Sequence, residues 1–358
     1  LAEEYGYADG GECLTVADKN EVWHFEIYGN GKLPEDPKAK KSKKAPVDKA
    51  GALWVAQRIP DDHVGVSANI PRIGVVDFND PDNFMYSKDL KERSKAIGHW
   101  SGEGDYVFWK VVSSGKKPFS IREWFVLSTL APSLNLKYEA DEIPFSVKPE
   151  KKVSPEDMFA FYRETYEGTE YDQVKNLSIE VDRRKMEDGK MVSYKETVYP
   201  VSTFMPGDMR TLLNSLKPDV TPRIRTIAVI QCSYSHIMQC RDWLPDEIGG
   251  IAYFSFDNPA QSPRIPIYAG VTELPKDWGV CGQHRYREDA AIWSYRETNR
   301  IATISWDKTR HLLEEQVANY ETQMMKENAL IEKEVAQLLK EGKKEEATKL
   351  LNNYTQKY

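Results

Sequence analysis

Two polar side chains interrupt an apolar stretch of the chain. In VGVSANIPRIG, residues 64–74, Asn69 and Arg72 lie among residues typical of a buried strand. A buried amide or guanidinium costs free energy unless it is hydrogen-bonded or paired, so both residues need partners. By strand parity, we expect them on opposite faces. Arg72 is able to hold a substrate carboxylate as a bidentate fork or to pair with a buried acid, and the sequence leaves both roles open.

Other reactive side chains form no self-contained site. The six histidines show no metal-ligand spacing, and no CxxC motif or Cys/His cluster suggests structural zinc. A Gly-rich phosphate loop is also missing. We therefore expect no metal and no cofactor.

Composition describes a well-packed globular protein. Of 358 residues, 40% are hydrophobic and 11% aromatic, and the formal net charge is −7. This negative balance argues against nucleic acid as a partner, and the basic run Lys38–Lys49 is best explained as a solvated loop. With no run of eighteen apolar residues, no membrane span is expected.

The elements that must position Asn69 and Arg72 indicate an α+β fold with antiparallel sheets, because regular strand–helix–strand alternation is missing. Alternating runs around a polar turn predict a hairpin at residues 13–18 and 21–28, and residues 52–58 and 64–75 predict a second strand pair. Residues 77–83 predict a plain turn. Further helices are expected at residues 87–100, 120–131 and 158–166, and further strands at 226–231, 236–239 and 250–256.

A different pattern begins near Trp306. From Leu313 to Leu338, apolar residues recur at alternating four- and three-residue steps, which predicts a long amphipathic helix with a narrow seam. Gly342 allows a break, after which residues 345–358 can return as a second helix. The seam fits either packing on its own domain or contact with a partner or second copy of the chain.

Five blocks of sequence, in order, carry a family resemblance. They are GGECLTVADKNEVWHFEI, ALWVAQRIPDDHVGVSANIPRIG, DFNDPDNFMYSKDL, REWFVLSTLAPS and QCSYSHIMQCRDWLPDEIGGIAYFSFDNP. In this order they resemble the secernin-like dipeptidases, a family of cysteine-type N-terminal-nucleophile (Ntn) hydrolases. The resemblance covers most of residues 1–305.

This resemblance implies a four-layer αββα sandwich that hydrolyses amide bonds in small peptides. In such enzymes the first residue of the mature chain is a cysteine whose own α-amine serves as the base. Residues 1–305 would form the C-terminal part of this domain, and residues 306–358 a helical extension. The resemblance therefore implies a hydrolase, more narrowly a thiol protease of the dipeptidase type, a peptidase that acts in proteolysis.

The start of the chain departs from the family pattern. Residue 1 is leucine, with no initiator methionine or signal-peptide pattern, and Leu1–Tyr5 followed by Gly6 looks like the end of a helix. We therefore expect a processed chain whose nucleophilic cysteine lies on an N-terminal segment or separate chain of the same protein. Cys13 stands where the family usually shows serine, and it has no free amine. Cys232 and Cys240 are expected to be buried apolar fillers.

The resemblance also suggests roles at the catalytic centre. Asn69 matches the asparagine near the oxyanion hole, although a plain backbone-capping role is the alternative. Arg122 is the candidate for the arginine beside the nucleophile, or else a structural ion-pair partner. A dipeptidase must also bind the substrate ammonium, and Glu12 and Asp61 or Asp62 are the candidate carboxylates.

Two further functions stay open. The fold could serve as a non-enzymatic binding or assembly module, with a homo-oligomer formed through the C-terminal helices, or the enzyme could cleave N-acyl amides of the penicillin V or bile-salt type. Because the family has cytosolic and exported members, the resemblance favours an exported bacterial protein only slightly.

Overall fold

The computed structural model describes residues 2–5, 10–31 and 51–358, so the basic run Lys38–Lys49 and Gly6 lie outside the described residues. The chain divides into two compact units, Leu1–Val153 and Ser154–Tyr358. The boundary expected between residues 305 and 306 therefore falls within the second unit. None of the helices in the described part of the chain has both the length and the apolar character needed to cross a bilayer.

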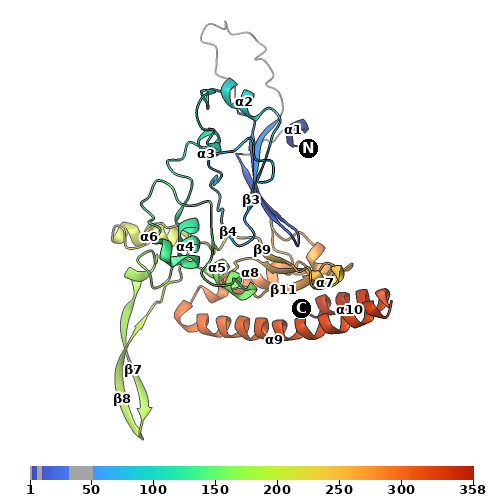
Figure 1. Ribbon diagram of the computed structural model, residues 1–358. Helices are drawn as coiled ribbons and strands as arrows, with labels where there is room; N and C mark the ends of the chain where they lie inside the picture. Colours follow the sequence, from blue (N-terminus) through green and yellow to red (C-terminus); the bar gives the residue numbers. More distant parts are fainter. Residues whose placement is uncertain (1, 6–9, 32–50) are drawn as a thin grey trace. The chain divides into compact units, whose positions relative to one another are not determined.

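The first unit combines short helices with strands (Figure 1). Its helices are α1 (Ala2–Tyr5), α2 (Leu90–Ala96), α3 (Phe108–Val112), α4 (Ile121–Leu130) and a 3₁₀ turn at Pro132–Leu134. Its strands are β1 (Glu12–Ala17), β2 (Val22–Gly29), β3 (Ala52–Ile59), β4 (Val64–Gly65), β5 (Phe84–Tyr86) and β6 (Ser146–Val147).

An antiparallel sheet of order β1-β2-β3-β5 forms the centre of this unit. The predicted hairpin is confirmed as β1 and β2, and Asp18 closes its turn by accepting hydrogen bonds from the backbone of Asn20 and Glu21. β3 is apolar on both faces, and Leu53 and Val55 are buried in the core. The strand β2, which carries polar side chains, is therefore hydrogen-bonded to the buried apolar strand β3.

The prediction that residues 52–58 and 64–75 form a strand pair is wrong. β3 pairs with β2 and β5 instead, and only Val64–Gly65 is a strand, paired with β6. Two features are incompatible with a strand that continues to residue 75: Asn69 has a φ of 62°, in the left-handed region, and Pro71 has no N–H to donate. The strand-parity argument that placed Asn69 and Arg72 on opposite faces therefore does not apply.

The predicted helix at residues 120–131 is confirmed as α4. The Ser120 hydroxyl accepts a hydrogen bond from the helix backbone, and the Glu123 carboxylate accepts one from the Ser120 backbone N–H, which together form a capping box. Pro132 comes two residues after Leu130, the last residue of the helix, where a helix stop was expected. The helix expected at residues 87–100 is shorter in the structure and forms α2.

The second unit has helices α5 (Pro155–Arg163), α6 (Gly207–Leu216), α7 (Asp246–Gly249), α8 (Ala291–Ala302), α9 (Trp306–Lys340) and α10 (Lys344–Lys357), with 3₁₀ turns at Lys175–Leu177 and Lys276–Gly279. Its strands are β7 (Ile179–Glu187), β8 (Lys190–Val198), β9 (Tyr234–Cys240), β10 (Gly250–Phe256) and β11 (Ile265–Tyr268).

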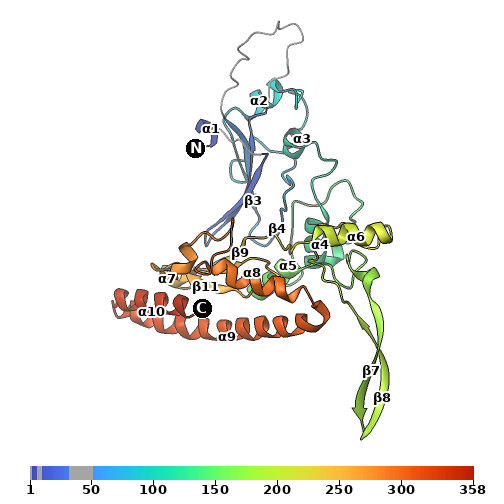
Figure 2. The same cartoon turned by 180° about the vertical axis from the view of Figure 1, so that it is seen from behind.

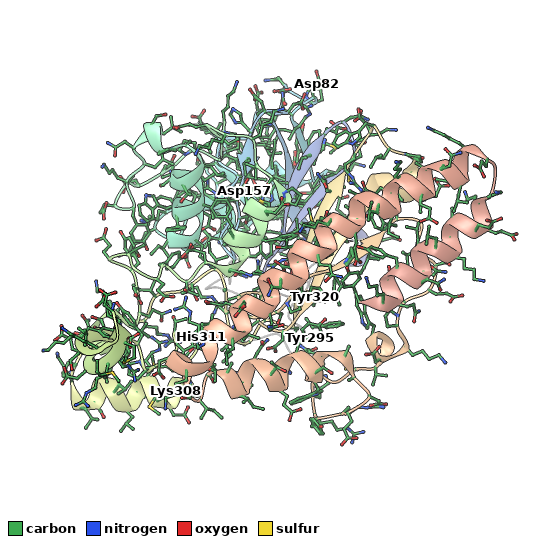
Figure 3. The ribbon with its side chains drawn as sticks, turned by 90° about the horizontal axis from the view of Figure 1, so that it is seen from below. Asp82, Asp157, Tyr295, Lys308, His311 and Tyr320 are labelled. Atoms are coloured by element: carbon green, nitrogen blue, oxygen red, sulfur yellow. The ribbon has the colours of Figure 1, made fainter. Side chains whose placement is uncertain are left out.

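The sheet β11-β10-β9 is antiparallel, and α9 and α10 lie along one side of it (Figure 1). Buried Ile237, Ile251 and Tyr253 of the sheet pack in one core with Met324 of α9 and Leu351 of α10. Figure 3 shows α9 running beside both α8 and α10, with Tyr295 of α8 and Tyr320 of α9 labelled. The predicted seam thus has buried contacts within its own unit.

Other predictions for this unit have mixed outcomes. The two helices and the break are confirmed, with Gly342 at a φ of 77°. The helix expected at residues 158–166 begins earlier, at Pro155, and ends at Arg163. The strand expected at residues 226–231 is irregular in the structure. The extended β7–β8 hairpin, visible in Figure 2, had not been predicted, because its polar residues gave no apolar alternation.

Candidate active site

The β1–β2 hairpin brings three reactive side chains to one face of the first unit's sheet. Cys13 is directly opposite Glu26, and Thr15 is opposite His24, so the period of two places Cys13, His24 and Glu26 on the same face. His24 Nε2 and Glu26 Oε1 are 3.2 Å apart. The Glu26 side chain is completely buried and His24 is nearly so, which makes both residues part of the interior.

Glu26 fixes the loop that contains Asn69 and Arg72. Its Oε1 accepts hydrogen bonds from the backbone N–H groups of Arg72, at 2.5 Å, and Ile73, at 3.2 Å. On the other side of the loop, the Ser67 hydroxyl donates to the Cys13 sulfur at 3.3 Å. Side chains thus satisfy backbone groups that a sheet ladder would otherwise engage, which explains how this irregular segment is tolerated inside the unit.

The Arg72 side chain is buried and links three segments of backbone by hydrogen bonds. Its guanidinium donates to the backbone carbonyls of Val66 at 3.2 Å, Pro118 at 2.7 Å and Pro144 at 2.5 Å. The residue is only 3% exposed. Burial lowers the pKa of Arg72, and the nearby Glu123 and Glu26 carboxylates oppose that shift. The expected roles were to bind a substrate carboxylate or to pair with a buried acid. In the structure the guanidinium instead donates to carbonyls of three backbone segments.

Asn69 and Arg122 contact each other. Arg122 Nη1 donates to Asn69 Oδ1 at 2.9 Å, and Arg122 Nη2 donates to the backbone carbonyl of Ala68. Since arginine is only a donor, this contact requires the oxygen of the Asn69 amide to face Arg122 and the nitrogen to face away. The Asn69 side chain is exposed, so the orientation presents its NH₂ group as a hydrogen-bond donor.

Glu123 anchors the same loop to α4. One carboxylate oxygen accepts from the Ala68 N–H at 2.7 Å, and the other accepts from the Ser120 backbone N–H at 2.8 Å. Glu123 is fully buried, so these bonds lie out of water. Ala68, next to Asn69, is therefore held through its N–H by Glu123 and through its carbonyl by Arg122. The two contacts restrain the backbone where Asn69 adopts its left-handed conformation.

A cavity of about 460 Å³ opens beside this network. Its lining includes Cys13, His24, His63, Ser67 and Asp61. The cavity therefore meets the sheet at the face that carries Cys13 and His24.

The three expected ammonium-binding carboxylates lie around this region with different partners. Glu12 is exposed and accepts a hydrogen bond from the Cys13 N–H. Asp61 accepts from Arg58 Nη2 at 2.5 Å, and Asp62 lies 2.8 Å from Lys148 Nζ, which lowers the pKa of Asp62. The structure thus brings Asp61 to the cavity lining, while Asp61 and Asp62 each already contact a basic side chain.

Cys13 lies in an environment that keeps its thiol protonated. Burial raises the pKa of Cys13 to about 11, the Ser67 hydrogen bond opposes this, and the Glu26, Glu12 and Glu123 carboxylates add to it. An activated cysteine needs the opposite surroundings, with nearby positive charge. Burial also raises the pKa of Cys232, which is half-buried, whereas Cys240 is exposed and not the buried filler expected from the sequence.

Sequence reasoning missed the buried anchors of this site. Glu26, Glu123 and His24 are polar residues inside apolar runs, EVWHFEI and IREWFVL, and this was the signal that singled out Asn69 and Arg72. Applied to every strand and helix, the same criterion would have found them.

A comparison with known proteins places the chain in a hydrolase class. The model of peptidase family C69 matches residues 1–319, and the chain belongs to this family. The resemblance to Ntn-type dipeptidases is therefore confirmed at the level of the family.

Individual relatives are named as dipeptidases. A probable dipeptidase of Latilactobacillus sakei is 26% identical over 282 residues, which are 78% of this chain and 47% of the relative. Dipeptidase A of Lactobacillus helveticus is 22% identical over 78% of this chain and 47% of its own length. A probable dipeptidase of Salmonella dublin is 25% identical over 89% of this chain and 62% of its own length. The chain spans about half the length of the first two relatives.

Proposed function

We propose that this chain supplies the oxyanion-binding part of a thiol-dependent dipeptidase. The nucleophilic cysteine would lie on an N-terminal segment or chain outside these 358 residues, and the two parts together would form the αββα sandwich typical of Ntn hydrolases. Membership of a peptidase family and the names of the relatives support peptide-bond hydrolysis. The protonated state favoured for Cys13 supports a nucleophile elsewhere.

The observation that carries the proposal is the hydrogen bond from Arg122 to Asn69. It fixes the Asn69 amide with its nitrogen directed away from Arg122, as a donor on an exposed side chain. When a thiolate attacks the substrate carbonyl, negative charge develops on the oxygen, and an oriented N–H donor stabilises it without reorganising. Arg122 acts through Asn69 as a positioning residue and adds positive charge that favours a nearby thiolate.

Binding of the dipeptide requires a group for its ammonium. Asp61 is the candidate on the cavity lining. Asp62 is its neighbour in the turn between β3 and β4, and Glu12 is the first residue of β1. A substrate ammonium would compete with Arg58 for Asp61. Arg72, by contrast, is assigned the internal role of holding the loop in shape.

The test uses two substitutions of Asn69 in the complete protein that contains the nucleophile. Asn69→Asp keeps the size, the tolerance of positive φ and the contact with Arg122, but it removes the donor. Asn69→Gly removes the donor and relieves the backbone strain. We expect both to lower kcat for dipeptide hydrolysis by about 10²–10³-fold, with little change in KM. Asn79→Asp, on an exposed turn, is the matched control.

Retention of kcat in both Asn69 variants would contradict the oxyanion role, since only a backbone role would then remain. The location of the nucleophile is tested separately by intact mass and N-terminal sequencing of everything that co-purifies with the chain. An alkylatable cysteine at a mature N-terminus is expected. Hydrolysis of N-acyl amides in place of dipeptides, or no hydrolysis by the complete protein, would instead favour the alternative functions.

A further inference from the structure

Three ligand types that suit zinc meet on the β1–β2 hairpin. One ligand atom each from Cys13, His24 and Glu26 lies within 4.8 Å of the other two. The spacing of histidines in the sequence had predicted no metal site. The ligands come from two strands, and only the pairing of Cys13 with Glu26 brings them together.

Glu26 gives an independent indication of a missing partner. The side chain is 0% exposed, and its hydrogen bonds to other residues that the structure describes involve Oε1. The other oxygen, Oε2, is buried without a hydrogen-bond partner among the described residues. A buried, unpaired carboxylate oxygen is costly, and a bound cation is a partner that would satisfy it.

We infer that Cys13, His24 and Glu26 bind one zinc ion at the floor of the 460 Å³ cavity. This inference does not depend on the proposed hydrolase activity.

Geometry and charge both fit this assignment. Tetrahedral zinc, with bonds of about 2.3 Å to sulfur and about 2.0 Å to nitrogen and oxygen, holds its ligand atoms about 3.5 Å apart. The observed limit of 4.8 Å requires a contraction of about 1 Å to reach this spacing. The thiol proton leaves on binding. A thiolate and a carboxylate then balance the two charges of the ion, so the buried complex is neutral.

The surroundings complete a three-ligand site. Cys13 and His24 line the cavity, which leaves the fourth position of the ion open to water or a small ligand. The Ser67 hydroxyl donates to the Cys13 sulfur, and the backbone N–H groups of Arg72 and Ile73 hold Glu26 Oε1. Such contacts orient the ligand atoms of a metal site.

Cobalt(II) is the probe for this site, because a thiolate bound to cobalt gives a near-ultraviolet charge-transfer band. The titration uses the complete protein in a Cys240→Ser, Cys281→Ser background, which removes the two exposed thiols. We expect one equivalent of cobalt, the thiolate band, and displacement by zinc. The absence of the band would overturn the inference.

Single substitutions then assign the ligands. Cys13→Ser, His24→Gln and Glu26→Gln should each weaken cobalt binding by more than about 100-fold, and Cys13→Ser should also abolish the thiolate band. Glu12→Gln, next to Cys13, and His63→Gln, on the same cavity, are the controls and should bind normally. Unchanged binding in Cys13→Ser, or equal affinities of Glu26→Gln and Glu12→Gln, would also overturn the inference.

X-ray absorption of the zinc-loaded wild-type protein requires no variant to fold. One sulfur at about 2.3 Å together with nitrogen or oxygen ligands at about 2.0–2.1 Å is the expected shell. A shell with no sulfur, or with more than one, would contradict the assignment.

Discussion

Replacing Arg72 tests whether this residue holds the site together or binds substrate. Arg72→Met keeps an unbranched apolar stem and removes the guanidinium. The carbonyls of Val66, Pro118 and Pro144 then lose their donor inside the unit. The Glu26 and Glu123 carboxylates also lose the positive charge that faces them.

The expected loss follows from these contacts. Leaving a buried acceptor unsatisfied costs about 1–3 kcal/mol, and breaking a buried charged cluster by removing one member costs about 3–5 kcal/mol. The bonds to Pro118 and Pro144, at 2.7 and 2.5 Å, are the shortest of the three, so we expect about 3–5 kcal/mol for Arg72→Met. Arg72→Lys keeps the charge but cannot reach all three carbonyls, and we expect roughly half of that loss.

The assay must report on the first unit alone, because a chain with two compact units need not unfold in one step. Hydrogen exchange of the buried β3 amides, at Leu53 and Val55, gives the opening free energy of this unit. Arg58→Met is the control, since the Arg58 guanidinium pairs with the exposed carboxylates of Glu21 and Asp61, and the substitution should cost less than about 1 kcal/mol.

A loss below about 1 kcal/mol for Arg72→Met, combined with a raised KM for dipeptides, would refute the internal role. It would restore the alternative in which the guanidinium binds the substrate carboxylate.

Two further predictions concern Cys13 and α10. A Cys13 thiol with a pKa of about 11, against an ordinary 9.0, is ~100-fold less ionised at pH 8. In the metal-free protein, iodoacetamide should therefore modify Cys13 at least ~100-fold more slowly than in the urea-unfolded chain. The rate in the folded protein should rise with pH up to about pH 11. Equal rates in folded and unfolded chain, read by peptide mass spectrometry, would contradict the buried, protonated state. Leu351→Ala should destabilise the second unit by about 2–5 kcal/mol, because Leu351 is fully buried, while Leu330→Ala on the exposed side of α9 should cost little. Similar denaturant midpoints for the two leucine variants would show that α10 does not form part of that core.

Local patterns in the sequence determined several elements of this protein. Alternating side chains around a polar turn predicted the β1–β2 hairpin, and Ser120 with Pro132 predicted both ends of α4. The apolar steps after Trp306 predicted α9, and Gly342 predicted its break. These features depend on backbone geometry and on periods within one segment, so neighbouring residues are enough to specify them.

The sequence also singled out Asn69, Arg72 and Arg122, but it could not say what each one contacts. Residues 66–73 form a loop and not a strand. Asn69 and Pro71 are incompatible with a continuous strand, and the Glu26 and Glu123 carboxylates accept hydrogen bonds from the backbone of the loop. Those two carboxylates lie more than forty residues away on either side of the loop. Contacts of that range are set by packing and not by local propensity.

The tertiary structure alone decided the chemistry of the site. It turned Arg72 inward toward backbone carbonyls and fixed the Asn69 amide through Arg122. It also placed Cys13 opposite Glu26 across two strands. In each case the outcome depends on which buried groups can satisfy one another in the absence of water, and only the folded chain determines which groups those are.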